Sequence, residues 1–233
     1  MQEFLRNYYT ILTFVVEAIA ALSGIICFKK YKETPVKYFI YFLIYVCVCE
    51  TLALYTLHVK DGVFSFLKDT LLEKNIWFTT LFWCIGSPVF YTFFYLKLIS
   101  SGVIKRVIKV LLLLFLVYSF LCIAFNFYTF FDSYFISIII SGEFLILFLV
   151  SVYLYEMLQS DRIINFYKSV YFYISATIFM WLLVTTPILF YDIYYTTADW
   201  NFIVLKWQIF LFSNILMYLT FSFALLWCNP EKR

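Results

Sequence analysis

The sequence is poor in charged residues, histidine and glycine, and each shortage excludes a class of protein. Charged residues make up 13% of the 233 positions, against about a quarter in a soluble domain. The single histidine, His58, excludes zinc sites that need several histidines. The five glycines form no phosphate-binding loop, and we find no G-x-S-x-G motif and no Ser/His/Asp set. We therefore expect a protein that is not an enzyme.

The cysteines do not form a metal-binding pattern. All six lie within or at the ends of apolar segments, and none belongs to a C-x-x-C pair. We expect buried thiols, and the sequence indicates neither a metal nor a cofactor. The six are Cys27, Cys47, Cys49, Cys84, Cys122 and Cys228.

Apolar and aromatic residues are abundant, at 65% hydrophobic and 24% aromatic, with a mean hydropathy of +0.92. This composition predicts an all-α integral membrane protein. Seven apolar runs each reach the length of about 20 residues that a bilayer crossing needs. The segments between them are short, so we expect one seven-helix domain over residues 1–233, with a small extra helix possible only at 59–75. The runs lie near 8–28, 36–58, 76–99, 106–126, 134–157, 167–190 and 203–228.

Lys and Arg residues predict the orientation of the helices, because they are enriched in cytoplasmic loops. The segments after the first, third and fifth helices, together with the C-terminus, carry twelve of them. The N-terminus and the other connecting segments carry four: Arg6, Lys60, Lys68 and Lys74. We therefore expect the N-terminus outside and the C-terminus inside. The twelve are Lys29, Lys30, Lys32, Lys37, Lys97, Lys105, Arg106, Lys109, Arg162, Lys168, Lys232 and Arg233.

Three acidic residues stand within the apolar runs, where a charge must find a partner, a proton or water. Glu17, Glu50 and Glu143 each come eight or nine residues from the expected outer end of a helix. The rise of a helix then places all three about 12 to 14 Å below the outer boundary. We expect them to share a polar chamber that binds a small ligand or a proton. Further polar residues at similar depths are Ser87, Tyr91, Lys206, Gln208, Asn214 and Tyr218.

The first helix has two unlike sides. The side that we expect to face protein carries small and polar residues at spacings of three and four: Thr10, Thr13, Glu17, Ala20, Ala21 and Gly24. The side that we expect to face lipid carries Leu12, Val15, Val16, Ile19, Leu22 and Ile26. Aromatic residues on several helices would line the chamber and suit an amphipathic or cationic ligand: Tyr41, Tyr45, Trp83, Tyr91, Tyr95, Trp181, Trp207 and Tyr218.

The fourth helix, at 106–126, has almost no polar stripe, so we expect it at the edge against lipid. That favours three helices, a peripheral helix and three more, an arrangement known as 3-1-3. Ser87-x3-Tyr91 and Asn214-x3-Tyr218 give the two halves a faint similarity. Pro88 frees the carbonyl of Cys84 and can bend its helix, either as plain curvature or to widen an outward cavity.

Two known families share this layout in part. The topology resembles that of microbial rhodopsins, but Lys206 is too near the outer end to match their retinal-binding lysine, and the third helix has no acid. The 3-1-3 layout also looks like that of the SWEET sugar transporters, whose prolines in helices 1 and 5 are not matched here.

Short loops, aromatic-rich helices, Gly142-Glu143 and Asn214-x2-Met217-Tyr218 carry a further resemblance over the whole chain. They make it similar to uncharacterised small seven-helix bacterial membrane proteins that accompany separate sensor kinases. The resemblance implies a place in the bacterial inner membrane and a signalling kinase as partner.

Three functions fit these features. The first is a non-enzymatic sensor or receptor that binds a ligand or proton in the chamber and signals through a separate protein at the basic inner loops. The second is a small proton- or cation-coupled transporter or channel that uses the buried carboxylates. The third is a structural subunit whose acids pair with basic residues of another membrane protein. None of them involves nucleic acid, because the basic residues report orientation.

Overall fold

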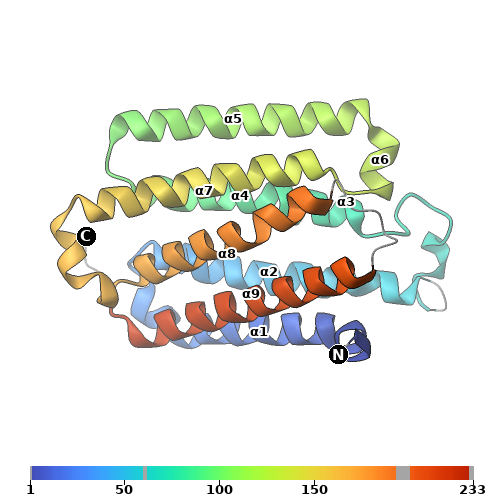
Figure 1. Cartoon of the computed structure of the whole chain (residues 1–233), viewed down its shortest axis with the longest axis horizontal. Helices are drawn as coiled ribbons and strands as arrows, with labels where there is room; N and C mark the ends of the chain where they lie inside the picture. Colours follow the sequence, from blue (N-terminus) through green and yellow to red (C-terminus); the bar gives the residue numbers. More distant parts are fainter. Residues whose placement is uncertain (1, 60–61, 193–199, 231–233) are drawn as a thin grey trace. The chain divides into compact units, whose positions relative to one another are not determined.

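The computed structural model describes residues 2–59, 62–192 and 200–230, and all regular structure in this part of the chain is helical (Figure 1). Seven helical segments are long and apolar enough to cross a membrane, so the chain is an integral membrane protein. The α-helices are α1 (Gln2–Tyr31), α2 (Val36–Ala53), α3 (Ile76–Thr79), α4 (Gly86–Leu98), α5 (Gly102–Phe125), α6 (Phe127–Asp132), α7 (Ile136–Leu158), α8 (Val170–Asp192) and α9 (Trp200–Trp227).

The predicted runs agree with these helices, with differences at four places. The run at 36–58 is α2 followed by a 3-10 helix, η1 (Leu54–His58). The run at 76–99 is α3, then a π-helix η3 (Thr80–Ile85), then α4. Two short helices outside the spans, α6 and the 3-10 helix η4 (Asp161–Lys168), were not expected. The 59–75 segment contains a short 3-10 helix, η2 (Ser65–Leu67), as predicted. Lys60, Lys232 and Arg233, which entered the charge count, lie outside the described residues.

The chain divides into two compact units. Unit 1 comprises residues 1–47 and 150–233, and unit 2 comprises residues 48–149. Unit 1 therefore includes α1, α8, α9, most of α2 and the end of α7. Unit 2 includes α3, η3, α4, α5, α6 and the beginning of α7.

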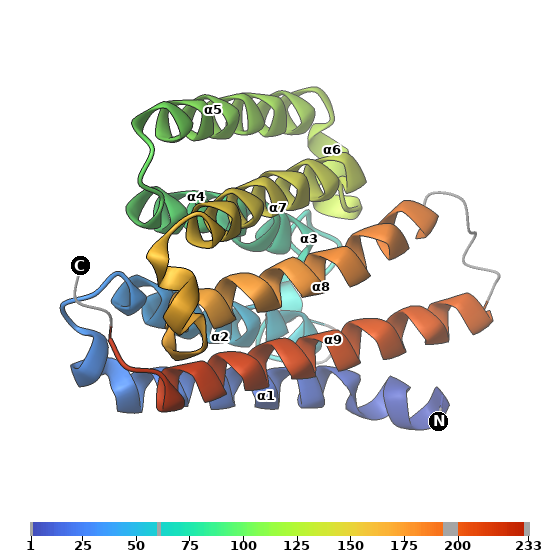
Figure 2. The same ribbon diagram turned by 60° about the vertical axis from the view of Figure 1, so that its left-hand side comes forward.

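In unit 1, α1 and α9 lie side by side and run in the same direction (Figures 1 and 2). Near their beginnings, the rings of Tyr9 and Trp207 have centroids 6.4 Å apart. Near their ends, the buried Tyr31 hydroxyl donates to the carbonyl oxygens of Cys228 at 2.6 Å and Leu225 at 3.2 Å. These bonds satisfy carbonyls that the end of a helix leaves without intrahelical donors.

The side of α1 that faces protein follows the predicted stripe over most of its length. Ala20 and Ala21 are buried, and a Cβ on Gly24 would meet Ile40 of α2 at 3.0 Å. The small residues therefore let α2 approach α1 closely. The prediction was wrong at Val16, which is only 8% exposed and not at the lipid surface, and at Leu12, which packs against Val204 and Leu211 of α9. It was also wrong at Thr10, which is exposed. A stripe one residue wide misses neighbours because the protein-facing arc of a helix spans more than 100°.

In unit 2, α5 is the least buried of the seven membrane-spanning segments. Its buried residues are Ile108, Phe115 and Ser119. At one end of this unit, the Tyr55 hydroxyl donates to the carbonyl oxygens of Leu72 and Lys74. The Lys74 ammonium also forms an exposed ion pair with Asp132 at the end of α6.

Candidate functional site

The three acids predicted to meet do not all belong to one unit. Glu17 lies in unit 1 and is 5% exposed, whereas Glu50 near the end of α2 and Glu143 in α7 lie in unit 2. The convergence of all three in one chamber stays a prediction. Each unit brings its own polar residues together.

In unit 1, the register of α1 and α9 sets the level of Glu17. Glu17 comes eight residues after Tyr9, and Ile215 comes eight residues after Trp207, which packs near Tyr9. Since parallel helices rise equally per residue, Glu17 lies at the level of Asn214 and Ile215. The side-chain oxygen of Asn214 accepts a hydrogen bond of 2.8 Å from the indole N–H of Trp181 in α8.

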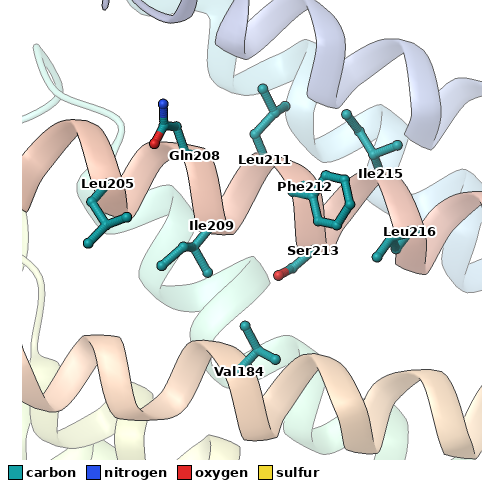
Figure 3. A pocket seen from close by; sticks show the side chains of 9 residues that line it. All are labelled: Val184, Leu205, Gln208, Ile209, Leu211, Phe212, Ser213, Ile215 and Leu216. Atoms are coloured by element: carbon teal, nitrogen blue, oxygen red, sulfur yellow. The ribbon is translucent and has the colours of Figure 1, made fainter.

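A cleft lies between α8 and α9 at about this level (Figure 3). One part has a volume of about 570 Å³ and a second of about 390 Å³, and both are lined by Val184, Ser213 and Leu216. Gln208 lines the first part and Trp181 the second. We call these two adjoining parts together the α8–α9 cleft. Most of its lining is apolar, with Gln208 and Ser213 as the polar side chains of the larger part.

The other predicted site residues of unit 1 lie on α9. Tyr218 is buried and its ring meets Phe221 edge to face, with centroids 5.9 Å apart. Lys206 is partly buried near the beginning of the helix. Of the nine predicted site residues, Gln208 lines the cleft and Asn214 is bonded to Trp181, which lines it.

In unit 2, a chain of ionisable side chains connects Glu50 with Glu143. The Tyr134 phenol interacts electrostatically with Glu50 and with the Cys84 thiol, and that thiol interacts with Glu143. Partial burial raises the pKa of Tyr134, and its hydrogen bond with Thr79 lowers the pKa by a smaller amount. The side chain keeps 46% of its surface exposed, but the phenol stays neutral at pH 7 because its ordinary pKa is already about 10. We call Glu50, Cys84, Tyr134 and Glu143 the acidic cluster.

The acidic cluster lies where the third membrane segment loses its α-helical pattern. The π-helix η3 ends at Ile85, and Pro88 follows within the first turn of α4. Proline lacks an N–H, so the carbonyl of Cys84 loses its usual intrahelical donor. A Cβ on Gly142 would lie 2.8 Å from Cγ of Pro88 and 3.3 Å from this carbonyl oxygen. The backbone of α7 therefore approaches the turn closely, which only glycine allows.

Several buried hydroxyl groups of unit 2 have no hydrogen-bond partner among the described residues. Ser87, a predicted site residue, is 6% exposed and precedes Pro88. Its neighbour Tyr91 is also buried. The other hydroxyls of this kind are Thr80, Thr92 and Ser119. Such groups cost free energy unless water or an ion bonds to them.

Some residues of these sites were not predicted. Ser213 and Val184 look like any residue of an apolar helix, and only the divergence of α8 and α9 makes them line a cleft. Tyr134 stands at the expected beginning of a span, where an aromatic residue is normally an anchor in the membrane interface. Nothing in the sequence distinguishes Tyr134 from such an anchor.

No group of three His, Cys, Asp or Glu residues that could hold a metal ion occurs in residues 2–59, 62–192 and 200–230. All six cysteines are free. Comparisons with protein families, curated proteins and solved structures found no match.

Proposed function

We propose that the protein is a non-enzymatic membrane receptor that binds a small, mainly apolar ligand in the α8–α9 cleft. The volume of this cleft carries the proposal, since its larger part measures about 570 Å³. Small-molecule sites fall in the range of about 300 to 1,000 Å³ and combine an apolar lining with few polar groups. Gln208 and Ser213 supply those polar groups here.

The chemistry of the lining defines the class of ligand. An apolar body would contact Val184, Leu216 and the Trp181 ring, while one polar end would bond to Gln208. Gln208 lies toward the beginning of α9, the end that we expect to face outside. An amphiphile with a single apolar chain fits this order of groups, because its polar end then lies nearer the membrane interface.

Ligand binding would act on the packing of α8 against α9. A ligand that fits only one separation of the two helices shifts the population toward it. The Trp181–Asn214 bond joins the helices beside the cleft, at the level of Glu17. The beginning of α8 follows η4, whose last residue is the basic Lys168. We assign the signalling output to a separate protein, a kinase or another membrane subunit. This partner would contact the basic loops that we expect on the inner side.

The test uses a brominated fatty acid as the probe, because bromine quenches nearby tryptophan fluorescence. In lipid nanodiscs, quenching of the wild-type protein should saturate as the probe is added. Trp181→Phe should remove most of the saturable quenching. Ser213→Leu fills the cleft and should weaken the apparent affinity by about tenfold, as expected for occluding about two methylene-sized contacts.

Ser151→Leu is the matched control, since it makes the same change on the exposed side of α7. It should leave saturable quenching intact. Quenching that rises linearly, with equal slope in all four proteins, would show that ordinary bilayer lipid fills the cleft and would contradict the receptor proposal.

The acidic cluster favours a second candidate, proton- or cation-coupled transport. Transporters place ion-binding acids beside interrupted helices, and Glu143 lies beside such an interruption at η3. Ion-driven flux in liposomes should then be lost in Glu50→Gln and Glu143→Gln and kept in Glu33→Gln, which changes an exposed loop acid. A flat signal in the wild-type protein across protons and alkali cations would exclude this candidate.

A further inference from the structure

The turn formed by the end of η3 and the beginning of α4 offers oxygen atoms in place of a regular hydrogen-bond ladder. Thr80–Ile85 is π-helical, a pattern that occurs mostly as single turns at functional sites. Pro88 cannot donate to the carbonyl oxygen of Cys84. This oxygen therefore lacks the backbone donor that a regular α-helix would supply.

A carboxylate lies beside this carbonyl. In Figures 1 and 2, α4 and the beginning of α7 lie side by side, and Gly142 of α7 lies against the turn. Its Cβ position lies 3.3 Å from the Cys84 carbonyl oxygen and 2.8 Å from Pro88. Glu143 is the next residue, and it interacts electrostatically with Cys84. The Glu143 carboxyl group therefore follows directly on the residue of α7 that lies against the turn.

Ser87 adds a third oxygen at the same level. It stands between Cys84 and Pro88, both of which lie against Gly142. Its hydroxyl oxygen is buried and has no hydrogen-bond partner within the described part of the chain. Without an ion or water, this oxygen would lose the hydrogen bonds that it makes in the unfolded state.

We propose that unit 2 binds a monovalent alkali cation, Na⁺, at this turn, through the Glu143 carboxylate, the Cys84 carbonyl and the Ser87 hydroxyl. Hard cations take oxygen ligands of these types, and carbonyls freed where a membrane helix is interrupted bind Na⁺ in transporters. One carboxylate balances one positive charge, whereas divalent sites usually recruit more acidic ligands. The site shares no residue with the α8–α9 cleft, so it is independent of the receptor proposal.

The test measures the thermal unfolding midpoint of the full chain in detergent against NaCl concentration, with choline chloride holding the ionic strength constant. A ligand that binds only the folded state raises the midpoint with the logarithm of its concentration. Glu143→Gln and Ser87→Ala should weaken the apparent affinity for Na⁺ by about tenfold or more, as loss of a ligating or orienting group does. Li⁺ and K⁺ arms measure selectivity among alkali cations.

Ser119→Ala is the matched control, because it removes another buried hydroxyl without a partner among the described residues of unit 2. It should keep the Na⁺ response of the wild-type protein. Equal midpoints in NaCl and choline chloride would overturn the proposal and leave water as the occupant of the turn. A Na⁺ response that persists in Ser87→Ala, or an equal response to Ca²⁺, would overturn it too. If Glu143→Gln does not fold, the comparison of the Na⁺ response of Ser87→Ala with that of Ser119→Ala tests the proposal.

Discussion

Single residues control how closely the helices of unit 2 approach one another, and Gly142 is the clearest case. A methyl group at this position would lie 2.8 Å from Cγ of Pro88 and 3.3 Å from the Cys84 carbonyl oxygen. The proline ring and the backbone cannot move aside at low cost. Gly142→Ala should therefore lower the free energy of unfolding by about 1 to 3 kcal/mol, the usual cost of overpacking. Unfolding by SDS titration in mixed micelles measures this value.

Gly102→Ala provides the comparison, because nothing lies within 4 Å of its Cβ position. This change should be neutral or raise the free energy of unfolding by about 0.4 to 1 kcal/mol, since alanine reduces the freedom of the unfolded chain. Equal effects of the two substitutions would show that α7 and α4 are not in close contact at Gly142.

For single residues, the sequence predicts which side chains are buried better than it predicts which side chains bond to one another. Glu17, Ser87 and Tyr218 were expected to face protein and are buried, because a polar group in a lipid-facing position costs more than one inside a bundle. Which groups bond to one another depends on the rotation and separation of helices. The Trp181–Asn214 bond needs α8 and α9 at one particular spacing, and no residue pattern specifies that spacing.

At the scale of the element, the third membrane segment departs most from a regular helix. We attribute the π-helical turn to Pro88, whose missing N–H disturbs the hydrogen bonds of the turn before it. Pro88→Ala supplies that N–H. Amide hydrogen exchange over residues 80–89 should then slow by up to about tenfold, which corresponds to about one net hydrogen bond.

Pro187→Ala is the control, since α8 continues as an α-helix through Pro187. Its effect on exchange should stay within α8. If exchange at η3 were unchanged in Pro88→Ala, packing against α7 and not proline would be the cause of the π-helical turn, and the Cys84 carbonyl would not be available through this route.

The membrane-spanning helices were predictable because hydropathy and length are local properties of the sequence. All seven segments lie at the predicted places. A proline indicated a distortion near residue 84, but not its π-helical form, because kinks and π-turns share the same signal. The short helix α6 was missed since its sequence, FYTFFD, has the aromatic composition of an interfacial loop. The α8–α9 cleft was missed because an apolar residue facing a cavity looks like one facing lipid.

At the scale of the whole molecule, the parallel pair α1 and α9 constrains the topology. Tyr31 at the end of α1 bonds to carbonyls at the end of α9, and Lys30 donates to the Leu226 carbonyl oxygen at 3.2 Å. The two helices therefore end on the same side of the membrane. Seven spans satisfy this condition, because an odd number places the first and last helices in the same direction.

The parallel pair leaves open which side that is, and the basic residues predict that it is the cytoplasm. Green fluorescent protein, which is fluorescent only when it folds inside, should fluoresce when fused after Arg233 or within residues 159–169. Alkaline phosphatase, which is active only outside, should be active when fused within residues 62–75. Replacing Lys29, Lys30 and Lys32 with Gln should reduce this asymmetry, because these residues follow the first span. The reverse pattern of reporter activity would show the opposite orientation, with the beginning of α9 and Gln208 on the cytoplasmic side. The α8–α9 cleft would then receive its ligand from inside the cell.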